Sequence, residues 1–320
     1  MRFGFLSKYF PPPRYLRPSH AGVSFSDSEI KAIYFDKTLN EPSLKSAAIP
    51  LEKGAIVAGS VVNADEVVKA LSLVKEHLDI PYIFFTIPDE LAYVFSATTT
   101  VGAKGGAAEN VAFIMEENVP LSLADTVFDF VPTSIRKSDS EYSADFVVAA
   151  CVKKEVMKFS EAIRRAGLEP VGCAHESQAI SRSVIADDFH EVSCIIHTRS
   201  NRIGIYLVKD NLVHFSTLRS ILTSDYKQPF LDEYNKFLDY CLKLEVTGKR
   251  PIENVFVCGE FEYAKQTVEA LVDSSEELKN IKLSNVWTNV FEIDKHLPEI
   301  PYERSLGFAG PVGAVLSDII

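Results

Sequence analysis

The sequence predicts an α/β protein of two lobes with a cleft between them. A pattern of strand, short turn and strand opens the first half at 21–35 and recurs in the second half at 194–218. In both halves apolar strand-like runs and amphipathic helices follow. The 320 residues, 47% of them apolar, are enough for two domains of ordinary size. Ligands prefer clefts between domains, so the space between the two openings is the first candidate site.

Composition narrows the class of partner. The formal net charge of -11 argues against nucleic acid and against a polybasic membrane patch. The cysteines form no C-x-x-C pair, so neither a zinc knuckle nor a redox dithiol is expected; they are Cys151, Cys173, Cys194, Cys241 and Cys258. We interpret them as small hydrophobic residues in a reducing compartment.

The first 18 residues are expected to form an arm. They carry four Lys or Arg side chains and the run Pro11-Pro12-Pro13. Their apolar stretches are too short for the core of a signal peptide, and no run of the chain approaches the ~18 apolar residues of a membrane span. We therefore expect a cytoplasmic protein without a membrane span of its own.

The first half begins with three expected strands, at 21–26, 30–35 and 53–62. Asn63 can cap the helix that follows, in which apolar residues repeat at helical spacing from Val67 to Leu78. Further strands are expected at 82–87, 93–100, 126–131 and 146–152, with a loop at 102–106 and a helix at 107–118. After them come an amphipathic helix at 153–166, closed by Gly167, then a strand at 168–173 and a helix at 177–186.

The second half repeats the scheme. Strands are expected at 194–197, 203–208 and 212–218, and Asp210 and Asn211 supply the turn between the last two. A long helix at 230–244, a strand at 254–258 and a helix at 262–272 follow.

The order of these segments resembles the PilM family of type IV pilus assembly proteins, relatives of the division protein FtsA. The resemblance covers the chain from about Gly22 to its end. Seven segments carry it, each similar to a family motif: Gly22 to Lys31 with its closing Ile30-Lys31, Val119-Pro120-Leu121, Ala166-Gly167-Leu168-Glu169-Pro170, Glu176 to Arg182, Val257-Cys258-Gly259-Glu260, Asn285 to Val290, and Leu306-Gly307-Phe308-Ala309.

The resemblance implies an actin-like (RNase H-like) two-lobed α/β fold with an inserted subdomain of the FtsA/PilM type. The implied division is an arm at 1–18, a first lobe at 19–81, 141–190 and 305–320, a peptide-binding insert at 82–140, and a second lobe at 191–304. The second lobe is expected to be reduced, because the chain runs from Arg219-Ser220-Ile221 almost directly into the next helix, where the family has a further segment.

The resemblance also implies a degenerate nucleotide site. In the family each opening hairpin carries an Asp that orders the metal and the attacking water, and a glycine turn whose amides face phosphate. Here Ser24 and His197 stand at the Asp positions, and Ser26 and Arg199 at the glycine positions. We therefore expect no catalytic residue, no metal-ligand set, and weak or absent binding of ATP and Mg.

Ten residues are the candidates for any remaining nucleotide contact: Ser26, Asp27, Ser28, Lys31, Glu176, Asn201, Arg202, Gly259, Glu260 and Gly307. Several also have a structural interpretation. Lys31 can contact phosphate or be a solvated lysine, and the serines can stabilise their turn. Arg199 and Arg202 can hold an anion or pair with carboxylates across the cleft.

The function implied by the resemblance is a cytoplasmic scaffold of a type IV pilus or related machine, peripheral at the inner membrane. A PilN-like membrane protein would recruit it: the cytoplasmic tail of that protein would bind in the groove between the insert and the first lobe of this chain. Other pilus assembly proteins are further candidate partners. The alternatives are an active ATP-binding or ATP-hydrolysing enzyme of the actin, sugar-kinase and chaperone superfamily, and an actin-like polymer former.

Overall fold

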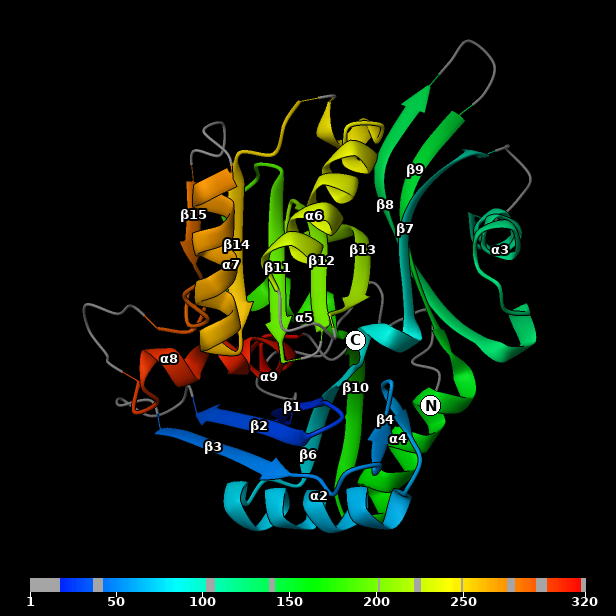
Figure 1. The fold of residues 1–320 in the computed structure, drawn as a ribbon. Coiled ribbons are helices and arrows are strands. Elements are labelled where there is room, and N and C mark those ends of the chain that lie inside the picture. Colours follow the sequence, from blue (N-terminus) through cyan, green and yellow to red (C-terminus); the bar gives the residue numbers. More distant parts are fainter. Residues whose placement is uncertain are drawn as a thin grey trace.

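The computed structural model describes residues 18–36, 43–101, 107–137, 142–200, 202–221, 226–248, 250–274, 280–291 and 298–317. The predicted arm, except for Pro18, and the predicted loop at 102–106 lie outside these residues. The described chain forms two α/β lobes, one above the other in Figure 1, and a third body beside the upper lobe. The predicted fold class is confirmed at this level.

The first lobe is built on a five-stranded sheet of order β10-β6-β1-β2-β3. Its strands are β1 (Ala21–Phe25), β2 (Glu29–Asp36), β3 (Ser43–Pro50), β6 (Tyr82–Ile87) and β10 (Glu169–His175). The first three pair antiparallel, and β6 and β10 join on the other side of β1 in parallel. Helices α2 (Ala64–Leu78) and α4 (Lys153–Arg165) bury their apolar sides against one face.

The second lobe repeats this topology in a sheet of order β13-β12-β11-β14-β15. Its strands are β11 (Ser193–Arg199), β12 (Arg202–Lys209), β13 (Leu212–Ser220), β14 (Asn254–Gly259) and β15 (Asn280–Leu283). Helices α6 (Lys227–Cys241) and α7 (Phe261–Ser274) cover its outer face. Residues 221–226 alone separate β13 from α6, so this connection has no room for a further subdomain. The duplicated openings and the reduced second lobe are thus present.

The inserted body is a three-stranded antiparallel sheet of order β7-β9-β8 with one helix. The strands are β7 (Ala92–Val101), β8 (Thr126–Lys137) and β9 (Tyr142–Val152), and the helix is α3 (Ala107–Asn118). Val111 and Met115 of α3 are buried against the sheet. In Figure 1 this body stands beside β13, on the side of the second lobe away from β15.

Two expected boundaries of the insert are wrong. Tyr82–Ile87 was assigned to it, but this strand is the buried centre of the first-lobe sheet, parallel to both β1 and β10. At the other end the insert includes all of β9 and reaches Val152, beyond the expected limit at 140. The insert therefore lies between the 3-10 turn Asp89–Leu91 and the start of α4.

The expected third strand at 53–62 is also wrong. Its place in the sheet is taken by β3, and 53–62 holds only the two-residue strands β4 (Ile56–Val57) and β5 (Ser60–Val61). Positive φ angles at Gly54 (91°), Ala58 (49°) and Gly59 (75°) turn the chain too often for a continuous strand.

Several local signals are confirmed. Asn63 caps α2 by accepting a hydrogen bond from the Glu66 N–H at 3.4 Å. Gly167 follows α4 with φ of 73°, and Asp210 and Asn211 form their turn with φ of 52° and 59°. Of the cysteines, all free thiols, Cys173 is exposed and departs from the expected buried role.

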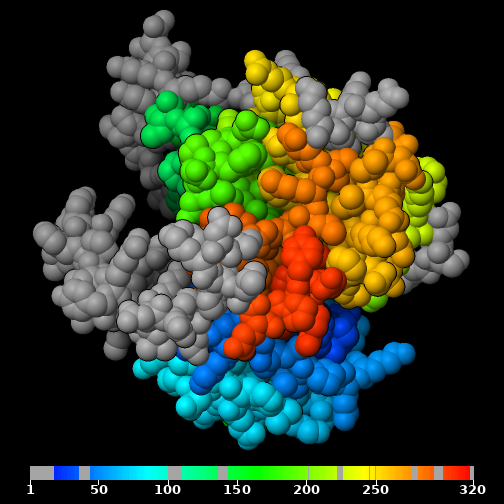
Figure 2. Space-filling model, turned by 90° about the vertical axis from the view of Figure 1, so that its left-hand side faces the viewer, coloured from blue at the N-terminus to red at the C-terminus, as the bar shows by residue number. Residues whose placement is uncertain are grey.

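The C-terminal segment joins the lobes. After the short helix α8 (Tyr302–Ser305), helix α9 (Ala309–Val315) packs against α5 (Glu176–Val184) and β1. Figure 2 shows this segment, in red, filling the boundary between the blue first lobe and the orange second lobe on one face. Within the described residues, no helix has the length and apolar character needed to cross a membrane.

Candidate functional site

The two opening hairpins face each other across a small cavity between the lobes. The cavity has a volume of about 30 Å³. Its lining comes from both hairpins, α5, the end of β14 and the C-terminal segment: Ser24, Ser26, Glu29, Lys31, Glu176, His197, Thr198, Arg199, Gly259, Glu260, Gly307 and Gly310. A single water needs roughly 10–15 Å³ by this measure. The cavity therefore has room for about two or three waters and not for a nucleotide.

Ser26 stabilises its own turn. Its hydroxyl donates to the Glu29 carbonyl at 2.9 Å and accepts from the N–H groups of Glu29 at 3.0 Å and Ser28 at 3.4 Å. The Ser28 hydroxyl lies 3.3 Å from that of Ser26 and is directed at the same turn. The structural interpretation of both serines accounts for every contact they make here.

Lys31 reaches the cavity but is paired within its own strand. Its ammonium lies 2.9 Å from a carboxylate oxygen of Glu29 and 5.8 Å from the centre of the Phe308 ring. Gly307 leaves the space that this ammonium occupies, since a Cβ there would lie 2.7 Å from Nζ. The side chain is 19% exposed, so Lys31 is largely shielded from solvent.

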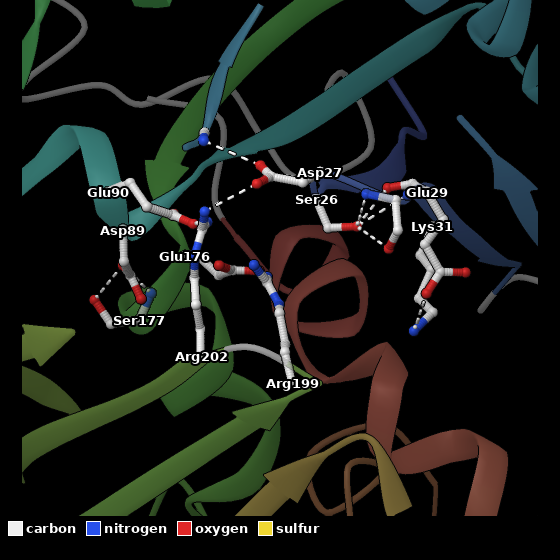
Figure 3. Close-up of polar contacts among 12 residues, drawn as sticks. Ser26, Asp27, Glu29, Lys31, Asp89, Glu90, Glu176, Ser177, Arg199 and Arg202 are labelled. Atoms are coloured by element: carbon white, nitrogen blue, oxygen red, sulfur yellow. Dashed lines mark hydrogen bonds and ion pairs between the residues drawn. The ribbon is translucent and has the colours of Figure 1, made fainter. Parts of the chain in front are cut away.

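Arg202 extends from the start of β12 across the cleft (Figure 3). Its Nη2 donates to Oδ2 of Asp27 at 2.9 Å, and its Nη1 is paired with Oε1 of Glu90. The Asp27 carboxylate also accepts the N–H groups of Ala58 and Gly59, both at 3.2 Å. Asp27 and Arg202, both predicted to contact a nucleotide, thus pair with each other.

Arg199 occupies the neighbouring position. Its guanidinium is hydrogen-bonded to the Glu176 carboxylate, which is 3% exposed (Figure 3). Burial raises the pKa of Glu176 to about 7, although Arg199 opposes this effect. Burial alone would lower the pKa of Arg199, but the surrounding acids, Glu176 first, raise it above its usual value. The arginine thus remains charged beside an acid that titrates near neutrality.

His197 is a buried neutral side chain. Burial, followed by the charges of Arg199 and Lys31, holds its pKa well below the ordinary value. On the neighbouring strand Gly259 has φ of 109° and its Cα lies against the backbone of Thr198, where a side chain would collide. The Glu260 N–H that follows donates to the Thr198 carbonyl at 2.8 Å. These residues shape the second-lobe wall of the cavity.

The structure adds a pair of acids that the sequence analysis did not select. Asp89 and Glu90 follow Pro88 at the end of β6, where the chain leaves the first lobe for the insert. Asp89 accepts hydrogen bonds from the Ser177 N–H at 3.0 Å, the Ser177 hydroxyl at 2.9 Å and the Tyr206 hydroxyl at 2.6 Å. Two acids at the carboxyl end of a buried parallel strand were the available signal, because ligands and functional groups gather there.

Most of the predicted site residues do come together. Ser26, Lys31, Glu176, Gly259, Glu260 and Gly307 line the cavity, and Asp27 and Arg202 lie beside it. Ser28 does not line the cavity, and Asn201 lies outside the described residues. Whether any of them binds a nucleotide stays a prediction.

In this arrangement the donors do not fit a metal-bound triphosphate. Mg²⁺ is held by oxygen ligands, commonly one or two carboxylates whose lone pairs are free to face the ion. The carboxylates of Asp27 and Glu176 face arginines instead. Across the part of the chain that the structure describes, no three His, Cys, Asp or Glu side chains are grouped as metal ligands.

No family model matches the chain, and no curated protein matches it. Solved structures do. The chain is similar to one in the PilM-PilN type IV pilus biogenesis complex, with a TM-score of 0.73 and 18% identity over 94% of this chain and 98% of that one. Weaker likenesses are to the ethanolamine utilization protein EutJ from Carboxydothermus hydrogenoformans (TM-score 0.47, 12% identity, 96% of this chain, 91% of that one) and to the inorganic polyphosphate/ATP-glucomannokinase from Arthrobacter sp. strain KM (TM-score 0.46, 11% identity, 94% and 98%). The first likeness shows an actin-like fold over nearly the whole chain.

Proposed function

We propose that this chain is a cytoplasmic actin-like scaffold of a type IV pilus or related inner-membrane assembly machine. In this proposal a PilN-like membrane protein recruits it through a cytoplasmic tail, and the scaffold does not turn over ATP. The observation that supports the proposal most is the likeness in fold, over 94% of the chain, to a protein from a PilM-PilN complex.

The contents of the cleft support the second half of the proposal. Ser24 and His197 stand where hydrolysis would need acids to order a metal and water. Arg199 and Arg202 pair with the remaining carboxylates. A scaffold needs the shape of the two lobes and the insert, and these residues preserve that shape without a bound nucleotide.

The exposed edge of the insert is the surface we assign to the tail. β8 is an edge strand, and Val127 and Val131, each 45% exposed, lie on one face of it. The strand starts opposite Val152, the residue just before α4 of the first lobe. An extended peptide can pair with such an edge and place apolar side chains on Val127 and Val131.

Calorimetry tests this assignment. The titrant is a synthetic peptide of the cytoplasmic tail of a PilN-like protein from the same genome. We expect one peptide per chain, with micromolar affinity that Val131→Asp weakens by about tenfold or more. Val272→Asp is the matched control, because Val272 is a valine of α7 in the second lobe with 61% exposure.

If the chain is instead an active ATPase, we expect ATP hydrolysis and no binding of the tail peptide. A chain that binds no tail peptide, and hydrolyses ATP in a manner that Lys31→Ala abolishes, would be an ATPase and not this scaffold. Tail binding that Val131→Asp and Val272→Asp affect equally would leave the scaffold in place but move the docking surface.

A further inference from the structure

We propose that Arg202 forms an interlobe latch with Asp27 and Glu90, which holds the cleft closed and fixes the insert without any nucleotide. The proposal rests on the proposed scaffold that does not turn over ATP, and it names the contacts that would replace a nucleotide between the lobes. It does not require that a tail peptide binds.

The latch joins three bodies at one guanidinium. Arg202 belongs to β12 of the second lobe, Asp27 to the turn between β1 and β2 of the first lobe, and Glu90 to the root of the insert. Figure 3 shows the Arg202 side chain between the two carboxylates, each of which faces a different terminal nitrogen. One side chain thus contacts residues of both lobes and of the insert.

The latch is shielded from water. The Arg202 side chain is 13% exposed, that of Glu90 10% and that of Asp27 30%. Charge-assisted pairs with a planar guanidinium are strong and directional, and burial reduces their screening by salt. A surface ion pair between flexible side chains would have little effect on lobe motion, but this arrangement has little freedom to rearrange.

The latch also extends into the first lobe. The same Asp27 carboxylate that receives Arg202 accepts the amides of Ala58 and Gly59, in the hairpin of β4 and β5. Ala58 has φ of 49°, unusual for a residue other than glycine, so this turn needs support from its surroundings. Loss of Arg202 leaves Asp27 free to reorient, and exchange at these two amides reports on it.

Hydrogen exchange of the full chain, read by mass spectrometry, tests the latch. We expect Arg202→Ala to speed exchange in the peptides that contain Ala58 and Gly59, and in those that contain Glu90, by about tenfold. Arg219→Ala is the control, because Arg219 is an exposed arginine on the adjacent strand β13. Unchanged exchange in the folded Arg202→Ala variant would overturn the latch.

A second pair of variants, Arg202→Gln and Glu90→Gln, tests the latch if Arg202→Ala does not fold. Glu90→Gln keeps the length of the side chain and removes its charge, and Arg202→Gln places a shorter, neutral side chain that can still donate hydrogen bonds. If the two residues act as one unit, the double variant should exchange no faster than the faster single variant. Effects that multiply would mean that the residues act separately and that no latch exists. Failure of the tail peptide to bind wild type would remove the proposed partner, whereas only these exchange results remove the latch.

Discussion

At the scale of single residues, Arg199 and Arg202 change what the cleft can contain. A turn that binds phosphate presents backbone amides and small side chains, because a nucleotide must approach the backbone closely. Here the second-lobe hairpin contributes two guanidinium groups, and the remaining cavity measures about 30 Å³. The positive charges neutralise first-lobe acids from within the protein.

Glu176 gives a prediction of pH dependence. Its folded pKa of about 7 lies above the ordinary value of 4.5 because of burial. A raised carboxyl pKa means that the folded state keeps a proton which the unfolded state has released between these values. The contribution of this proton to the free energy of unfolding is therefore complete below pH 4.5. As the pH rises to about 7 the free energy of unfolding decreases by up to roughly 3 kcal/mol.

Urea unfolding at a series of pH values measures this contribution. In Glu176→Gln the decrease in the free energy of unfolding between pH 4.5 and 7 should become shallower, because the amide does not ionise. Glu303→Gln, at an exposed acid, should keep the wild-type slope. Equal slopes in all three proteins would mean that folding does not raise the pKa of Glu176.

At the scale of elements, sequence patterns predicted those helices and strands whose limits depend on nearby residues, such as a capping side chain or a run of apolar residues. Helix α2 begins where Asn63 caps it, and β6 matches its run of buried residues. β3 was missed because it is an edge strand rich in Ser and Ala that ends at Pro50, so it has neither strong alternation nor bulky apolar residues. The apolar residues at 55–58 and 61–62 favoured a strand instead, although the glycines at 54 and 59 permit a hairpin.

The candidate site was only partly predictable for a different reason. Resemblance placed Lys31, Glu176 and Gly307 at one cavity, and pairing of the arginines with acids across the cleft was one of two open interpretations. Which acids they meet depends on packing between segments up to 175 residues apart, as for Arg202 and Asp27. No local pattern shows that Glu90, at the root of the insert, faces the same guanidinium.

The contact between α9 and α5 gives a prediction at this scale. Gly313 lies so close to Ala179 that a Cβ would collide with the Ala179 carbonyl oxygen. Gly313→Ala should therefore reduce the free energy of unfolding by about 1–3 kcal/mol. Gly310→Ala is a matched control in the same helix, where the nearest atom to a new Cβ is Ser24 Cβ at 3.4 Å, an ordinary contact. Denaturant titration of both variants measures the difference, and equal stabilities would show that α9 can shift away from α5.

At the scale of the whole molecule, the lobes, the insert and the C-terminal helices are connected by more than the chain itself. Tyr206 of the second lobe donates to Asp89 beside the insert, and Ser96 of the insert donates to the His214 carbonyl of β13 at 3.1 Å. Gln178 of α5 donates to the Asn211 carbonyl at 2.7 Å. A body held by such contacts has a defined shape without a ligand between its lobes.

This leads to a prediction about ATP. In the proposed scaffold Ser24 and His197 replace two charge-assisted ligands worth ~1.5–3 kcal/mol each, and we expect this to lower the affinity for ATP by about a hundredfold or more. With a dissociation constant of about 1 mM or higher, 1 mM ATP with magnesium stabilises the fold by no more than about 0.4 kcal/mol. For a chain of this size that is a melting-temperature shift of about 1 °C or less. Thermal unfolding with and without Mg-ATP measures it, with the tail peptide as the ligand expected to give a larger shift. An increase of several degrees with Mg-ATP that disappears in Lys31→Ala would show that the cleft opens and still binds nucleotide, and that the pairs made by Arg199 and Arg202 yield to it.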